Sequence, residues 1–112
     1  MKVFDYTDIP AQKAEEGAKN TTIRWLITKD IGAETFAMRY FEMDVGGYSP
    51  YHIHDWEHEV FILEGEGVIK SEEGDIPFNA GSAVFIPANE RHQFRNTGSN
   101  PVKFLCLIPY KG

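Results

Sequence analysis

The sequence predicts an all-β protein built as a small sandwich or barrel. Short runs rich in β-branched and aromatic residues recur along the 112-residue chain, a composition typical of strands. Turn sequences such as GGYSP, EEGD and NTGSNP separate these runs at the close spacing of small sandwiches and barrels. No run of residues has the apolar stripe of an amphipathic helix, so helices are not expected in the framework.

Seven segments are predicted as strands, because each combines β-forming residues with flanking turn residues. In chain order they are residues 22–28, 35–43, 58–63, 67–71, 82–87, 92–96 and 102–108. The preceding segment, residues 11–20, is polar, contains a glycine and has no apolar stripe, so we expect a solvated loop. The acidic sequences at 14–16 and 72–75 are interpreted as solvated turns.

Length and charge limit the domain organisation and the partners. A chain of 112 residues suits one domain with one core, so a single domain over residues 1–112 is expected. The net charge of −6 and the pI near 5.1 oppose binding to nucleic acid and to anionic membrane surfaces. The sequence shows no cluster of Lys and Arg that would offset this charge. Neither nucleic acid nor a membrane is therefore expected as a partner.

The length of the apolar runs and the single cysteine indicate the cellular compartment in which the protein is expected. The longest apolar runs, VFIL and FLCLI, are far too short to span a membrane, and the first ten residues lack the apolar core of a signal peptide. The single cysteine, Cys106, cannot form an internal disulfide, as is usual in a reducing compartment. We therefore expect a cytoplasmic protein with a free thiol.

The histidines are unevenly distributed. Three of the four, His52, His54 and His58, fall within seven residues, and His92 opens the predicted strand 92–96. On a strand, His52 and His54 would point to one face and could share a metal ion. Imidazole binds transition metals, whereas calcium and magnesium prefer oxygen ligands. Because isolated H-x-H pairs also occur on exposed strands, the surrounding spacing decides what this pair means.

The first histidine cluster lies inside a glycine framework that spans Gly46 to Gly65. Five residues separate Gly46 from His52, one separates His52 from His54, and three separate His54 from His58. Six further residues lead to Gly65. This spacing resembles the first motif of the cupin family, with His58 at the position where the family usually has glutamate.

A second framework surrounds the fourth histidine. Five residues separate Gly81 from Pro87, and Asn89, His92 and Asn96 follow at intervals of one, two and three residues. This spacing resembles the second cupin motif, with Asn89 where the family usually has glycine. Asparagine tolerates the left-handed backbone conformation that a turn at this position can require.

The resemblance implies a double-stranded β-helix, the jelly-roll barrel of single-domain cupins. The sequence around Trp56, the histidine at the glutamate position and FLCLIP near the end are similar to the small four-histidine, manganese-binding cupins of thermophilic bacteria. The resemblance places the metal ligands at His52, His54, His58 and His92.

The ligand set implies a particular kind of metal chemistry. One divalent transition metal is expected, with manganese favoured by the resemblance and iron, zinc, nickel and copper as alternatives. Four neutral imidazoles leave the full charge on the ion, which makes it a stronger electrophile than a carboxylate-containing site would. An octahedral shell would keep two places for water, dioxygen or a bidentate anion, which is typical of catalytic sites.

Five residues are candidates for the pocket around the metal: Arg39, Phe94, Phe104, Cys106 and Ile108. Phe94 shares a strand face with the fourth histidine, and Phe104, Cys106 and Ile108 share a face on the last strand. Cys106 is either a buried small apolar residue or a thiol beside the metal. Arg39 is either solvated or ion-paired, or it points inward and could hold a carboxylate substrate.

Three functions remain open for a small-molecule partner, because this fold supports many activities. The first is a dioxygenase-like oxidoreductase, favoured by the open metal positions and the absence of an obvious acid–base pair. The second is a non-catalytic binding or sensing module, favoured by the short chain. The third is a sugar isomerase, which would need a base, for which only Glu57, Glu59 and Arg39 are candidates.

The sequence also predicts self-association. Phe61 and Leu63 are opposite in parity to His58, so they can pack between sheets or between subunits. Strand edges in so short a barrel are most simply covered by a second copy. We expect a homodimer.

Overall fold

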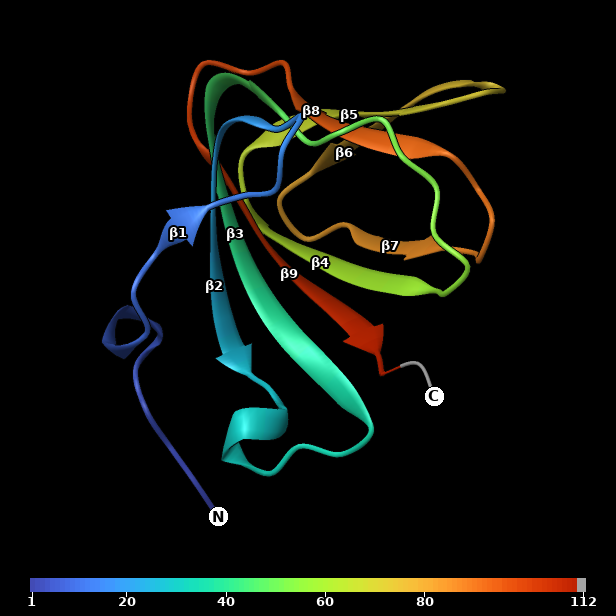
Figure 1. Ribbon diagram of the computed structural model, residues 1–112. Coiled ribbons are helices and arrows are strands. Elements are labelled where there is room, and N and C mark those ends of the chain that lie inside the picture. The colour runs from blue at the N-terminus through green and yellow to red at the C-terminus, as the bar shows by residue number, and fades with distance from the viewer. Residues whose placement is uncertain (111–112) are drawn as a thin grey trace.

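Strands curl into an open barrel, as Figure 1 shows for the computed structural model, which describes residues 1–110. The strands are β1 (Gln12–Lys13), β2 (Lys19–Ile27), β3 (Phe36–Tyr48), β4 (His58–Glu64), β5 (Glu66–Ser71), β6 (Gly74–Asn79), β7 (Ala83–Ile86), β8 (His92–Asn96) and β9 (Val102–Pro109). Two short 3-10 helices, η1 (Tyr6–Asp8) and η2 (Lys29–Ile31), complete the described part. The predicted all-β barrel is confirmed.

All strand pairs are antiparallel, and the order is β6-β5-β8-β3-β9-β4-β7, with β2 pairing β1 and β3 outside this path. In Figure 1, β6, β5 and β8 lie across the barrel from β4 and β7, and β3 and β9 join the two halves. Within residues 1–110, no helix is long and apolar enough to cross a membrane.

All seven predicted strands overlap an observed strand, and two segments differ from the prediction. Residues 11–20 are not only a loop, because β1 lies within them and β2 begins there. Strand β6 was not predicted, because Pro77 and the polar residues around it are typical of turns. Proline is tolerated there since β6 is an edge strand that pairs only with β5.

The core fills the barrel between the two halves of the sheet. Met43, Ile62 and Val102 are fully buried. The ring of Phe104 stacks on Phe41 and on Phe94, with centroids 4.9 Å and 5.0 Å apart. Along β9 the buried residues alternate with partly exposed ones, as expected for a strand with one face inward. The inward face of β9 is therefore the one that carries Phe104 and Cys106.

Asn96 ties the end of β8 to the neighbouring backbone. Its side chain is buried, and Nδ2 donates to the carbonyl oxygens of Met43 at 3.1 Å and Asn100 at 2.9 Å. Its Oδ1 accepts from the backbone N–H of Gly98 at 3.0 Å. One amide thus replaces backbone pairing where β8 ends, and it satisfies groups that would otherwise be buried without partners.

We expect Asn96→Ala to lower the free energy of unfolding by about 1–3 kcal/mol, because it leaves the buried Met43 carbonyl without its donor. Urea unfolding of the metal-free protein would measure this change. Asn100→Ala is the matched control: its side chain is exposed, and its backbone carbonyl still accepts the bond. Equal effects of the two substitutions would contradict this role of Asn96.

Candidate metal centre

Three chain segments bring the four histidines together. His52 and His54 lie on the connection from β3 to β4, His58 is the first residue of β4, and His92 is the first residue of β8. The connection is held against β8 by two backbone hydrogen bonds, from His52 N–H to the His92 carbonyl at 3.1 Å and from His92 N–H to the His52 carbonyl at 3.0 Å. The connection is not a regular strand, so tertiary pairing rather than strand parity aligns the first two rings.

The turn before β8 also fixes the connection. Asn89 has a left-handed backbone with φ of 67°, which explains why asparagine can replace glycine at this position. Its N–H donates to the His54 carbonyl at 2.6 Å. The ring of Trp56 stacks on the His54 ring at 4.3 Å, which holds that imidazole in the cavity wall.

The four imidazoles surround one space. The ring centroids of His52 and His54 are 4.2 Å apart, and those of His54 and His58 are 5.2 Å apart. The centroid of His92 lies 5.0 Å from that of His58 and 4.9 Å from that of His52. The rings therefore form a closed circuit in which each imidazole has a neighbour on either side.

The rings of His92 and His58 each make a contact through Nδ1, which leaves the Nε2 atom of each ring free. The Nδ1 atom of His92 lies 2.9 Å from the Glu90 carbonyl oxygen, which can only accept, so Nδ1 carries the proton. The Nδ1 atom of His58 lies 3.5 Å from Cys106 Sγ, and its Nε2 atom is buried without a partner among the described residues. A buried ring nitrogen without a hydrogen-bond partner is unfavourable unless something binds it, so this arrangement fits a metal ion.

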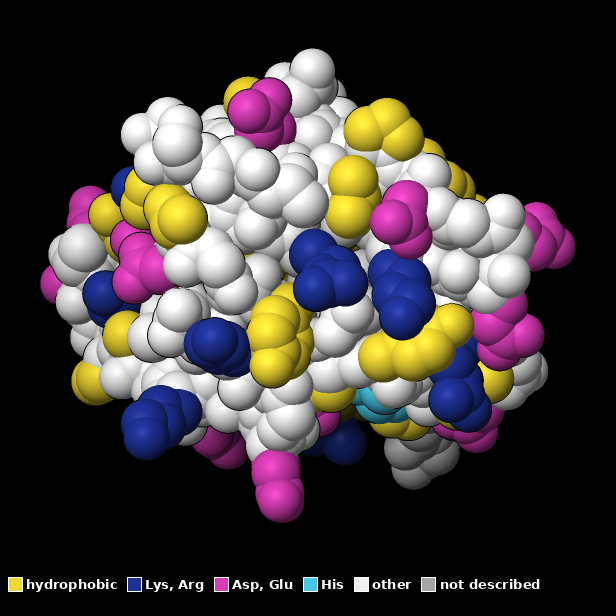
Figure 2. Space-filling model, turned by 90° about the horizontal axis from the view of Figure 1, so that it is seen from above, with side chains coloured by type: hydrophobic (Ala, Val, Ile, Leu, Met, Phe, Trp, Pro, Cys, Tyr) yellow, Lys and Arg dark blue, Asp and Glu magenta, His cyan; other side chains and the backbone are white. Residues whose placement is uncertain are grey.

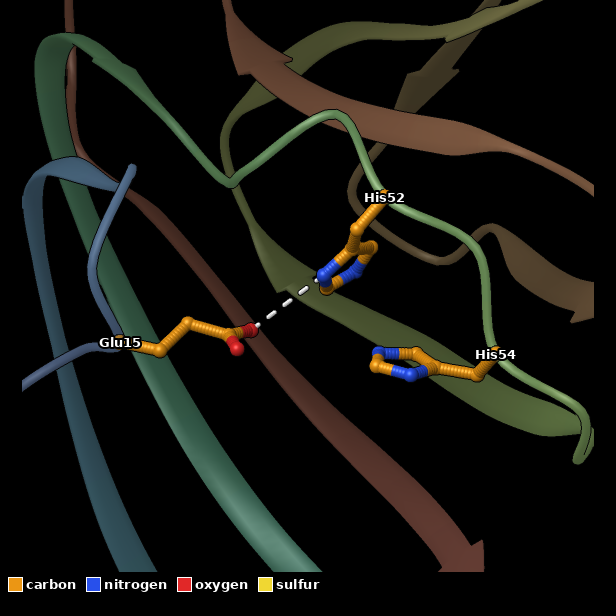
Figure 3. Close-up of side chains that lie close together, drawn as sticks. All are labelled: Glu15, His52 and His54. Atoms are coloured by element: carbon orange, nitrogen blue, oxygen red, sulfur yellow. Dashed lines mark ion pairs between the residues drawn. The ribbon is translucent and has the colours of Figure 1, made fainter.

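Glu15 joins the site from a segment interpreted as a solvated turn. In Figure 3 its carboxylate reaches from the loop after β1 towards His52, and its Oε1 lies 3.5 Å from His52 Nδ1. Ligand atoms of Glu15, His52 and His54 lie within 4.8 Å of one another. Glu15 can therefore bind a metal ion with these histidines or accept the His52 Nδ1 proton. No spacing in the sequence indicates this residue, because only the pairing of β1 with β2 brings it to the cavity.

Burial keeps the imidazoles neutral. Desolvation, with the charges of neighbouring histidines and of Arg39 adding to it, lowers the pKa of His52 to about 4 and that of His58 to about 3. Desolvation also lowers the pKa of His54 and of His92. Neutral imidazole is the form that binds metal, so all four histidines are in that form at neutral pH.

The histidines open into a cavity of about 50 Å³. The other residues that line it are Ala14, Glu15, Ala18, Thr21, Arg39, Phe41, Met43, Ser49, Pro50, Phe94, Phe104 and Cys106. Four of the five pocket candidates are thus at the cavity. Ile108 instead lines a separate surface hollow with Glu57 and Glu59, so these two carboxylates are not beside the histidines.

The fold gathers cations that are dispersed in the sequence. Lys70 and Arg91 both lie over the ring of Tyr51, and Arg95 lies over the ring of Tyr48. In Figure 2, the face seen from above has Lys and Arg side chains beside hydrophobic ones. These cations are apart in the sequence and approach one another because β8 pairs with both β5 and β3.

Solved structures share this architecture. The polyketide cyclase RemF from Streptomyces resistomycificus is 36% identical, with a TM-score of 0.93 over 99% of this chain and 80% of that one. A protein from Thermotoga maritima, described as a predicted oxalate decarboxylase, is 26% identical, with a TM-score of 0.85 over 98% of this chain and 100% of that one.

Curated relatives match over part of their length. An oxalate-binding protein of Thermotoga maritima is 40% identical over 58 residues, which are 51% of this chain and 48% of that protein. A 1-methylthio-D-xylulose 5-phosphate methylsulfurylase of Rhodospirillum rubrum is 31% identical over 104 residues, which are 90% of this chain and 65% of that protein. The chain thus spans about half to two thirds of the length of these relatives.

The sequence model of the Cupin domain family matches residues 39–108, a range that contains both histidine motifs. The barrel, the two motifs and the solved structures agree with this match. The resemblance predicted from the motifs is confirmed, and the chain belongs to the cupin family.

Proposed function

We propose that this cupin is an oxidoreductase in which the four histidines hold a divalent transition metal, manganese in preference to iron, zinc, nickel or copper. The observation that carries the proposal is the closed circuit of four neutral imidazoles around one cavity. The unpartnered Nε2 atom of His58 supports it. A metal with open coordination positions would supply Lewis acidity and a redox centre beside a small organic substrate.

The residues of the chain have defined tasks in this proposal. The Glu90 carbonyl and Cys106 orient the rings of His92 and His58 through their Nδ1 atoms. Phe94 and Phe104 form an apolar wall of the cavity, which offers no hydrogen bonds to water. Such a wall suits reaction of a small organic molecule with dioxygen, because water would otherwise compete for the open positions.

A second candidate is a reaction without net oxidation, such as a cyclisation or an isomerisation. Glu15 favours it, because a carboxylate at the cavity could accept a proton from a substrate. RemF, with a TM-score of 0.93, is a polyketide cyclase, and another similar structure is a sugar phosphate isomerase. The two candidates differ in their need for dioxygen.

The test begins with protein purified without oxygen and loaded with manganese, iron or zinc in turn. We expect one ion for each chain, measured by elemental analysis, and oxygen uptake with members of a panel of small phenols, alkenes and carboxylic acids. Product formation without oxygen uptake would favour the second candidate. Binding of a panel member without turnover would support a non-catalytic module instead.

Ligand assignment is tested by His58→Ala, with Glu59→Ala as the matched control. We expect His58→Ala to weaken manganese binding by at least about tenfold. Loss of a residue that only supports a metal ligand typically lowers metal affinity about 10- to 100-fold, and loss of a ligand itself should lower it at least as much. Glu59→Ala should bind as the wild type does, since Glu59 lies in the hollow with Ile108. Calorimetric titration measures both. Equal losses would remove His58 from the ligand set.

The lowered histidine pKa values predict a pH dependence of stability. A histidine whose pKa is lower in the folded state than its value of 6.5 in the unfolded chain binds fewer protons when folded. The free energy of unfolding of the metal-free protein should therefore be highest above pH 6.5 and fall as the pH decreases towards 4. Each such histidine contributes a slope of up to about 1.4 kcal/mol per pH unit.

Urea unfolding between pH 7.5 and 4.5 measures this slope. The variant His58→Ala provides the comparison, because the pKa of His58, about 3, is lower than that of His52. Its slope should be shallower than that of the wild type. A wild-type stability that does not change over this range would show that the imidazoles are not desolvated in the metal-free protein.

We also propose that the protein works as a homodimer. The outer face of β4 and β7 exposes Phe61 by 47%, Leu63 by 39% and Phe85 by 58%, which is unusual for side chains of this size.

We expect a dimer mass in light scattering at micromolar concentration. Replacing Phe61 and Phe85 by serine should yield a monomer, whereas Ile76→Ser, on the separate edge strand β6, should not. A monomer in the wild type would contradict the proposal.

A further inference from the structure

Arg39 is an arginine inside the barrel. It lies on β3 opposite Cys106 of β9, and its Nη2 atom donates to Cys106 Sγ at 3.0 Å. The guanidinium carbon lies 5.5 Å from the ring centroid of Trp25 and 5.0 Å from that of Phe41. Two aromatic rings and a thiol thus hold the guanidinium in one position.

The charge of Arg39 has no counterion in the described chain. The ion pairs among residues 1–110 are formed by other cations, and none includes Arg39. Its Nε atom is buried and has no hydrogen-bond partner among those residues. A partly buried cation without an anion is unfavourable, and aromatic faces and a neutral thiol are weak acceptors for its N–H groups. The guanidinium is therefore a positioned donor group whose hydrogen-bond acceptor among residues 1–110 is a thiol and not an anion.

This donor group belongs to the same cavity as the histidines. Arg39 lines that cavity with Phe41, Phe94 and Phe104, and its positive charge contributes to the lowered pKa values of the histidines on the β3–β4 connection. About 50 Å³ of space, at about 10–15 Å³ for each enclosed water molecule, holds about four waters. An occupant of this space has only a few non-hydrogen atoms.

We propose that Arg39 anchors a short organic carboxylate in this cavity, with the rest of the ligand directed towards the four histidines. Guanidinium presents two parallel N–H groups that match the two oxygens of a planar carboxylate. A single anionic charge balances the single cation, whereas a phosphate dianion would need further donors, and Lys70, Arg91 and Arg95 do not line the cavity. The inference rests on the proposed function only for the part of the ligand that would approach the histidine-bound metal. The contact between the carboxylate and Arg39 needs no metal.

The first experiment compares charged and neutral ligands of one shape. Acetate and glycolate, with acetamide and glycolamide as the neutral counterparts, are titrated into the manganese-loaded protein by calorimetry, and inorganic phosphate is tested beside them. We expect each carboxylate to bind at least about tenfold more tightly than its amide, since hydrogen bonds to charged groups are about twice as strong as neutral ones. Equal binding of acid and amide, or tighter binding of phosphate, would overturn the inference.

The second experiment uses Arg39→Met, which keeps the length of the side chain but removes the charge. Arg95→Met is the matched control, because Arg95 is exposed over the ring of Tyr48 and outside the cavity. We expect carboxylate affinity to fall about 10- to 100-fold in Arg39→Met and to stay within about twofold in Arg95→Met. An unchanged affinity in Arg39→Met, or equal losses in both variants, would contradict the assignment.

Two further measurements separate anchoring from a structural role. The melting temperature of metal-free Arg39→Met should be no lower than that of the wild type, because the substitution removes a partly buried charge without a counterion. Arg39→Lys keeps the charge without the paired donors and should bind with intermediate affinity. A lower melting temperature with unchanged carboxylate binding would show that Arg39 acts only in packing.

A failure of the metal site would be distinguishable from a failure of this inference. If the wild type takes up no metal, the proposed function is wrong, and the same titrations on the metal-free protein then decide the inference. Carboxylate binding that is lost in Arg39→Met but kept in Arg95→Met would support the anchor without any metal. Absence of such binding in both metal-free and metal-loaded protein would reject it.

Discussion

The site depends on two backbone hydrogen bonds between His52 and His92. They join the connection after β3 to the start of β8, segments that are far apart in the sequence, and each bond belongs to a residue whose ring faces the cavity. Pairing of the backbones therefore aligns two imidazoles directly. The bond from Asn89 N–H to the His54 carbonyl extends the alignment to a third ring, and the register of β4 with β9 brings His58 beside Cys106. The barrel is in this sense the scaffold of one ring of histidines.

Two polar side chains that line the cavity have a nitrogen atom without a hydrogen-bond partner among residues 1–110. The His58 Nε2 atom and the Arg39 Nε atom are both buried, and neither has a hydrogen-bond partner among residues 1–110. A core made only for stability would avoid such groups, because each is unfavourable by about 1–3 kcal/mol when desolvated. Both lie on the part of the cavity wall formed by the neighbouring strands β3, β9 and β4, so the fold without a ligand loses some stability there. Aromatic packing of Phe104 with Phe41 and Phe94 offsets part of this loss.

Much of the framework follows from local sequence patterns. Runs of β-branched and aromatic residues between turn sequences predicted the strands, and the spacing of the histidines predicted which residues gather. Glu15 could not be found in this way, because its approach to His52 depends on the pairing of β1 with β2 and on no pattern within residues 11–20. Strand β6 was missed because an edge strand tolerates proline and polar residues. Ile108 shares strand parity with Cys106, yet it lies beyond the cavity, because parity fixes a face of the strand but not the position along the barrel.

Charge connects the interior of the barrel with its surface. The whole chain carries a net charge of −6, but the cavity holds neutral imidazoles, the cation Arg39 and the carboxylate of Glu15, and a divalent ion would add two positive charges. In a poorly solvated space such charges interact strongly, whereas the acidic groups on the outer surface are screened by water and salt. Local charge, rather than net charge, therefore decides what enters. The cations over Tyr48 and Tyr51 lie outside the cavity, and one of them, Arg91, is paired with Glu72, so water, salt and acidic neighbours weaken their effect compared with that of Arg39.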